Sequence, residues 1–136
     1  MINVIIGEKG TGKTARLIEA VHTAEKAATG SVVFIKKGNR HVLDLSHKVR
    51  LVNTEEYGIS NYDDFYGFVC GILSQNYDIA HIFIDSITKI VNDDIAALEA
   101  FLSKISAVAE SSNAEIQIIL RMNPDVASDE IKKYVK

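Results

Sequence analysis

The sequence predicts an α/β fold with a mainly parallel sheet of about five strands, formed by a single domain spanning residues 1–136. Short runs rich in Val and Ile alternate with longer segments whose apolar residues recur at helical spacing. Continuous apolar runs are typical of parallel strands that are buried on both faces, and their alternation with helices is typical of strand–helix–strand units. We therefore expect three layers, with helices on both faces of the sheet.

The first strand is expected at residues 2–6, which read Ile-Asn-Val-Ile-Ile. A helix is expected at 15–28, because its apolar residues fall on one face, and Gly30 is placed to end it. The apolar, β-branched run at 31–35 predicts the second strand.

A polar, cationic turn follows, formed by Lys36, Lys37, Gly38, Asn39, Arg40 and His41. The next two apolar runs, 42–45 and 49–52, are short and ambiguous, and 49–52 is the better strand candidate. Residues 54–58 are expected to form a loop.

A helix at 61–76 is predicted by an apolar face, and Asn61 or Ser60 is placed to cap it. The run 80–86 reads as a strand that ends on a carboxylate. A further helix at 93–109, with Asn92 as its cap, leads to a strand at 115–120. Residues 128–136 are expected to form a short closing helix, acidic at its start and basic at its end.

Between the first strand and the first helix lies Gly7-Glu8-Lys9-Gly10-Thr11-Gly12-Lys13-Thr14, here called the glycine loop. It matches the phosphate-binding pattern G-x-x-x-x-G-K-[ST] at every position. Glycines let the backbone turn tightly and aim successive N–H groups at a polyphosphate, and the following helix adds its positive end. Lys13 is expected to reach the β- and γ-phosphates, and the Thr14 hydroxyl to coordinate Mg²⁺. The predicted nucleotide-binding residues are Gly7, Glu8, Lys9, Gly10, Thr11, Gly12, Lys13, Thr14 and Ala15.

Asp85 stands at the end of the apolar run Ile82-Phe83-Ile84. A carboxylate in this place is expected to hold Mg²⁺ through a water, beside Thr14. Strands also end in Asp because this residue forms turns, so the metal role depends on the glycine loop upstream.

With these two motifs, nearly the whole chain resembles the P-loop NTPases. Phe83-Ile84-Asp85-Ser86-Ile87 is most similar to the RecA-like recombinase and hexameric-helicase branch. The order of elements is also similar to that of type II thymidine kinases, and the glycine loop alone to that of twitching-motility ATPases. The resemblance implies a three-layer α/β/α P-loop fold that binds ATP with Mg²⁺. It also implies a homo-oligomer or an unidentified protein partner, because RecA-like proteins often assemble with the nucleotide between subunits.

The chain departs from that pattern where a catalytic glutamate is expected. Many P-loop ATPases have Glu directly after the strand-end Asp, where this chain has Ser86, and RecA-like proteins take it from the strand end occupied here by Lys36-Lys37. Glu8, Glu55 and Glu56 are alternative bases, or simply solvated carboxylates. Any hydrolysis is therefore expected to be slow.

Arg121 and Asn123 follow the last predicted strand, where related ATPases often place a sensor of the γ-phosphate. Arg121 is also a candidate arginine finger, and the alternative is a solvated residue. The predicted catalytic residues are Lys13, Asp85 and Arg121. The cationic turn at 36–41 fits an acidic substrate, nucleic acid or a partner, or else an ordinary loop.

Composition narrows the classes of function. A net charge of −3 and a pI near 5.8 argue against a general nucleic-acid-binding surface. Cys70 is the only cysteine, so an internal disulfide and the zinc ribbon of thymidine kinases are excluded, and its apolar neighbours suggest a core thiol. No run reaches membrane-spanning length and no signal peptide is expected, which favours the cytoplasm. His22, His47 and His81 lack metal-ligand spacing.

The expected function is Mg²⁺-dependent ATP binding with slow or partner-dependent ATPase activity. A nucleotide-gated interaction module and a small-molecule kinase are the alternatives. ATP is preferred over GTP because no guanine-reading Asn/Thr-Lys-x-Asp motif is present.

Overall fold

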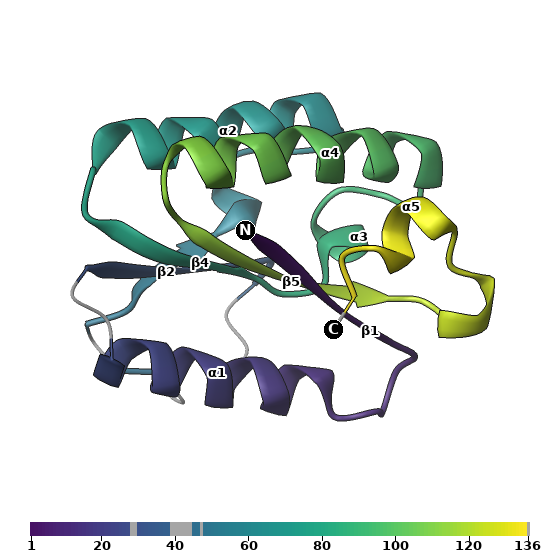
Figure 1. Cartoon of the computed structure of the whole chain (residues 1–136), viewed down its shortest axis with the longest axis horizontal. Helices are drawn as coiled ribbons and strands as arrows, with labels where there is room; N and C mark the ends of the chain where they lie inside the picture. Colours follow the sequence, from purple (N-terminus) through teal and green to yellow (C-terminus); the bar gives the residue numbers. More distant parts are fainter. Residues whose placement is uncertain (28–29, 39–44, 47, 136) are drawn as a thin grey trace.

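A five-stranded parallel sheet forms the centre of the molecule (Figure 1), as seen in a computed structural model that describes residues 1–27, 30–38, 45–46 and 48–135. The strands are β1 (Ile2–Gly7), β2 (Ser31–Lys36), β3 (Arg50–Asn53), β4 (Ile79–Ile84) and β5 (Glu115–Arg121). The helices are α1 (Lys13–Ala27), α2 (Tyr62–Gln75), α3 (Ile87–Ile90), α4 (Ile95–Ser111) and α5 (Asp129–Lys132). Two short 3₁₀ helices, η2 (Thr54–Glu56) and η3 (Pro124–Val126), complete the described elements. The predicted mixed α/β fold with a parallel sheet of five strands is confirmed.

The strands lie in the order β1-β5-β4-β2-β3. All described pairs are parallel, so the carboxyl ends of the strands meet at one edge of the sheet. Strand β5 lies between β1 and β4, which places the end of β5 between the glycine loop and Asp85. This edge is where ligands bind in open parallel sheets.

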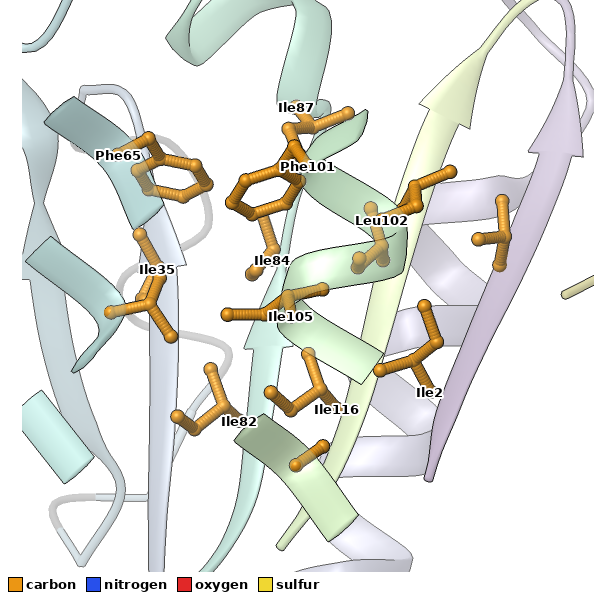
Figure 2. Close-up of a cluster of buried hydrophobic side chains, with 14 of the residues drawn as sticks. Ile2, Ile35, Phe65, Ile82, Ile84, Ile87, Phe101, Leu102, Ile105 and Ile116 are labelled. Carbon is orange, nitrogen blue, oxygen red and sulfur yellow. The ribbon is translucent and has the colours of Figure 1, made fainter. Parts of the chain in front are cut away.

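Helices cover both faces of the sheet. In Figure 1, α2 and α4 lie above the sheet and α1 lies below it. Figure 2 shows the larger core, where Phe101 of α4 lies close to Ile84 of β4 and Phe65 of α2 lies on the side of Ile35 of β2. The smaller core on the other face joins Leu17 and Val21 of α1 to sheet residues such as Phe34. Burial of these side chains from water is the main source of stability for such a fold.

The helix caps agree only partly with the prediction. Asn61 caps α2, since its side chain accepts a hydrogen bond from the Asp64 N–H. The predicted cap Asn92 is wrong: α4 begins later and is capped by Asp94, whose carboxylate accepts from the Ala97 N–H. Asn92 instead accepts from the Asp94 N–H and so shapes the preceding turn.

The carboxyl-terminal helix is shorter than predicted. It covers only Asp129–Lys132, because the chain then turns so that the Tyr134 carbonyl accepts the Val4 N–H at 2.8 Å. Val135 forms an isolated parallel bridge with Val4 at the outer edge of β1. The ambiguous run at 42–45 lies almost wholly outside the described residues, as do Asn39, Arg40, His41 and His47.

Gly30 follows the described end of α1 at Ala27, and the two residues between them lie outside the described ranges. Glycine is required at this position because a Cβ atom would lie 2.1 Å from the Asp78 carbonyl oxygen. One smaller expectation needs correction. Cys70 is not a core thiol. It is half-buried on α2.

Candidate functional site

The glycine loop depends on its glycines in two ways. Gly10 and Gly12 have φ values of +84° and +79°, a region that side chains with a Cβ rarely adopt. Gly7 is required by close packing, because a Cβ atom there would lie 2.7 Å from Thr11 Oγ1 and 3.3 Å from Lys13 Cδ. The loop is therefore folded tightly over the side chain of its own lysine.

Lys13 is buried, with 8% of its surface exposed, although it is charged. Its Nζ donates to the Glu8 carbonyl oxygen and, at 3.3 Å, to Thr11 Oγ1. Thr11 Oγ1 in turn donates to the same Glu8 carbonyl at 2.7 Å. These contacts hold the ammonium group inside the loop, where it also lines an open cleft.

The surroundings of Lys13 lower its pKa below the ordinary 10.5. Burial is the main cause, and the neighbouring charge of Arg121 acts in the same direction. The carboxylates of Asp85 and Glu8 oppose this effect. The positive charges of Lys13 and Arg121 therefore repel each other, and a bound anion would offset this repulsion.

The turn after β4 has an unusual backbone. The Asp85 N–H donates to the Ile35 carbonyl at 2.9 Å, which fixes Asp85 to the end of β2. Ser86 adopts a left-handed conformation, with φ +56° and ψ +66°, and its Oγ donates to Asp85 Oδ1 at 3.1 Å. A left-handed serine is sterically unfavourable, and strain of this kind gathers at functional sites. The turn reverses the chain directly into α3.

One cleft of about 310 Å³ brings most of the predicted residues together. Its lining comes from the glycine loop and the start of α1, the ends of β2 and β5, the turn after β4, and α3. The described lining residues are Lys9, Gly10, Gly12, Lys13, Thr14, Ala15, Lys36, Lys37, Asp85, Ser86, Lys89 and Arg121. Six of these are basic and one is acidic, so the cleft is suited to an anion.

Other candidate residues lie away from this lining. Glu55 and Glu56 are exposed in η2 and are not among the described lining residues. Glu8 is exposed beside a neighbouring hollow, which it shares with Asn123 and Arg121. The Asn123 side chain accepts from the Asp125 N–H at 2.9 Å and so caps η3, which is a structural role.

The other basic residues of the cleft differ in how well the sequence predicts their position. Lys36 and Lys37 follow a predicted strand, and polar residues at the carboxyl ends of parallel strands meet at one edge of the sheet, which here also holds Asp85. Lys89 carries no such signal. It reaches the cleft only because of the turn at Ser86, which begins α3.

The oxygen donors of the cleft are of the kind that Mg²⁺ prefers. Thr14 and Asp85 supply a hydroxyl and a carboxylate, which are hard ligands, and Mg²⁺ usually takes its other ligands from phosphates and water. Within the described ranges, no group of three or more His, Cys, Asp or Glu residues is placed to hold a metal by itself.

None of the helices in the described part of the chain has the length and apolar character needed to cross a bilayer. In comparisons with known proteins, the chain matches no family model and no curated protein.

Proposed function

We propose that the chain is a Mg²⁺-dependent ATP-binding protein with a three-layer α/β/α P-loop fold and a minimal RecA-like core, and that any ATP hydrolysis is slow or depends on a partner. One observation carries this proposal: the glycine loop, Asp85 and Arg121 line the same basic cleft at the carboxyl edge of a parallel sheet. Motif, topology and charge support the same ligand.

Each residue has a distinct part in binding. The loop amides and the start of α1 would surround the phosphates, and the Lys13 ammonium would neutralise the β- and γ-phosphates. Thr14 and Asp85 would hold the metal, which draws charge from the phosphate oxygens when it is bound. Arg121 ends β5 between the glycine loop and Asp85, and this position supports the proposal that it contacts the terminal phosphate.

Slow hydrolysis is expected because the described lining of the cleft offers no second carboxylate as a general base. Asp85 is the single carboxylate among the described lining residues, and the metal role occupies it. Its Oδ1 also accepts a hydrogen bond from the Ser86 hydroxyl. The positions where related ATPases carry glutamate hold Ser86 and Lys36.

The same observation supports a nucleotide-gated interaction module as the second candidate. Such a protein would use ATP or ADP to order its loops, with hydrolysis incidental to binding. The two candidates share the site and differ in turnover alone.

Steady-state phosphate release with Mg²⁺ and ATP, measured with and without DNA, distinguishes the ATPase from the interaction module. The ATPase proposal expects slow turnover that is lost in Asp85→Asn. Phosphate release no faster than in a protein-free control under both conditions, together with tight nucleotide binding, would support the interaction module instead. Fast turnover by the isolated chain would contradict the expectation of slow hydrolysis.

A further inference from the structure

We propose that the outer edge of β3 binds a second copy of this chain, and that the two copies pair there in antiparallel fashion about a two-fold axis. This pairing is independent of nucleotide binding, because β3 lies at the opposite edge of the sheet from the strand that leads into the glycine loop. Three features of the β3 edge support it: an open strand, a hollow with a matching aromatic side chain, and complementary charges at the two ends of the strand.

The two edges of the sheet differ in how far the chain covers them. On the outer side of β1, the Tyr134 carbonyl accepts the Val4 N–H at 2.8 Å, and Val135 forms a bridge with Val4. Among the described residues, β3 pairs with β2 alone. An unpaired strand presents backbone donors and acceptors to any other strand that approaches it. The β3 edge is therefore the side on which the sheet can be extended.

A hollow of about 370 Å³ lies between α2 and the start of β3. It arises because β3 pairs with β2 only from Val33 onward, which leaves Val32 without a strand beside it on this side. Leu45 and Val49, from the connection between β2 and β3, pack in the smaller core on the α1 face. The hollow opens on the opposite face, next to α2.

The lining of this hollow suits an aromatic side chain with a polar tip. Val52, Ile72 and Ile79 give it an apolar wall. The exposed side chains of Lys48 and Arg50 complete the lining. Aromatic rings pack well on aliphatic groups and attract cations to their faces, and a phenolic hydroxyl also needs a polar neighbour.

A side chain of that kind stands just past the other end of the same strand. Tyr57 follows η2 and is 56% exposed, and its ring centroid lies 5.3 Å from that of Phe68. In an antiparallel pair about a two-fold axis, the end of each strand lies beside the start of the other. Tyr57 of each copy is thereby brought to the hollow of the other, and both contacts form together.

The charges at the two ends of β3 match in the same arrangement. Lys48 and Arg50 stand at its start, and Glu55 and Glu56 follow its end, all four exposed. Antiparallel pairing puts the basic start of each strand beside the acidic end of the other, whereas parallel pairing in register would put like charges together. Charged residues at a sheet edge discourage indiscriminate pairing, and here they favour one arrangement.

The surface beside the strand enlarges the contact. A pair of four-residue strands alone buries less than the about 1,200 Å² that a stable interface usually needs. Phe68 and Ile72 of α2 are half-buried, and they adjoin Tyr57 and the hollow, respectively. Two-fold pairing would bring these apolar side chains together in both copies, so the contact extends from the strand onto α2.

Sedimentation equilibrium of the full chain without nucleotide tests the pairing. The chain has a mass of 15.0 kDa, and wild type is expected to follow a monomer–dimer equilibrium that saturates at twice this mass. Arg50→Glu should raise the dimer dissociation constant about tenfold or more, because two symmetric attractive contacts become repulsive. Glu56→Arg should have the same effect, and the double variant Arg50→Glu/Glu56→Arg should restore dimerisation. Tyr57→Ser should weaken the dimer without any change of charge.

A matched control is available at the other edge of the sheet. Lys132→Glu makes the same change of charge on α5, close to the bridge that Val135 forms with β1, and should leave the dissociation constant unchanged. Arg50, Glu56 and Lys132 are all exposed, so the variants should fold, and circular dichroism verifies this.

The possible results distinguish this pairing from other forms of assembly. A chain that stays monomeric up to about 0.5 mM overturns the inference. A mass that grows beyond two copies also overturns it, because a head-to-tail contact does not close. So does a dimer that both single charge reversals leave intact, or one that the double variant fails to restore, since the copies would then meet through another surface.

Discussion

At the scale of single residues, Lys13 links the fold of the loop to its chemistry. The same burial that packs its side chain under Gly7 also lowers the pKa of its ammonium group. In the free protein this disfavours the charged form, so the free energy of unfolding rises with pH in the window between the lowered pKa and 10.5. A bound polyphosphate would act in the opposite direction, because it favours the ammonium form.

Nucleotide binding is therefore expected to take up protons at alkaline pH. The affinity should be full below the lowered pKa of free Lys13 and should fall as the pH rises from there toward the raised pKa of the complex. Dissociation constants measured across this range, with calorimetry in buffers of different ionisation enthalpy, report the uptake. An affinity that stays constant until the pH reaches 10.5 would show that Lys13 is not perturbed.

At the scale of elements, glycines that look alike in the sequence have different roles. Gly30 lies against the Asp78 carbonyl, which accepts the Ser31 N–H at 2.7 Å and so ties the start of β2 to the chain before β4. Gly67 lies on the exposed side of α2, and a Cβ atom there meets nothing within 4 Å. One glycine is required by packing and the other only weakens a helix.

This contrast predicts opposite effects of one substitution. Gly30→Ala should lower the free energy of unfolding by about 1–3 kcal/mol, because the backbone must move to admit the methyl group. Gly67→Ala should raise it by about 0.5–1 kcal/mol, since alanine is the better helix former. Chemical denaturation of both variants provides the measurement, with nucleotide affinity as a check that the site is intact. Equal free energies of unfolding in the two variants would contradict the close packing of Gly30 against the Asp78 carbonyl oxygen.

The sequence predicts an element when the residues that determine it lie within that element. The strands were visible as Val- and Ile-rich runs, and Asn61 was visible as a cap because its hydrogen bond spans only three residues. The α3 helix was missed because it is a single turn that follows an unfavourable conformation at Ser86. The bridge between Val4 and Val135 was missed because it joins opposite ends of the chain. For the same reason the sequence placed Asp85 and Arg121 at strand ends but did not show which strands are neighbours.

At the scale of the whole molecule, charge is distributed unevenly. Among the residues that the structure describes, six Lys or Arg side chains line the cleft with one Asp or Glu side chain, in a chain that has fifteen Lys and Arg and eighteen Asp and Glu. The rest of the chain is therefore strongly acidic. An acidic body with one basic cleft discourages non-specific binding of polyanions and directs small anions to one place.

Association with a nucleotide should accordingly slow as salt is added. Raising NaCl from about 0.05 to about 0.5 M shortens the range of the field from more than 10 Å to a few ångströms, and the association rate should fall several-fold. Stopped-flow mixing with a fluorescent ATP analogue gives this rate. A rate independent of salt would indicate that the basic cleft does not attract the ligand.

The central claim is that eight consecutive residues, Gly7 to Thr14, hold a polyphosphate, and Lys13→Ala tests it most directly. The variant should fold, because Thr11 Oγ1 still donates to the Glu8 carbonyl at 2.7 Å and a buried charge is removed. Calorimetric titration with Mg²⁺ and a non-hydrolysable ATP analogue should give saturable one-site binding to wild type, weakened about a hundredfold in Lys13→Ala. No binding to wild type, or equal affinity in the folded variant, would contradict the account.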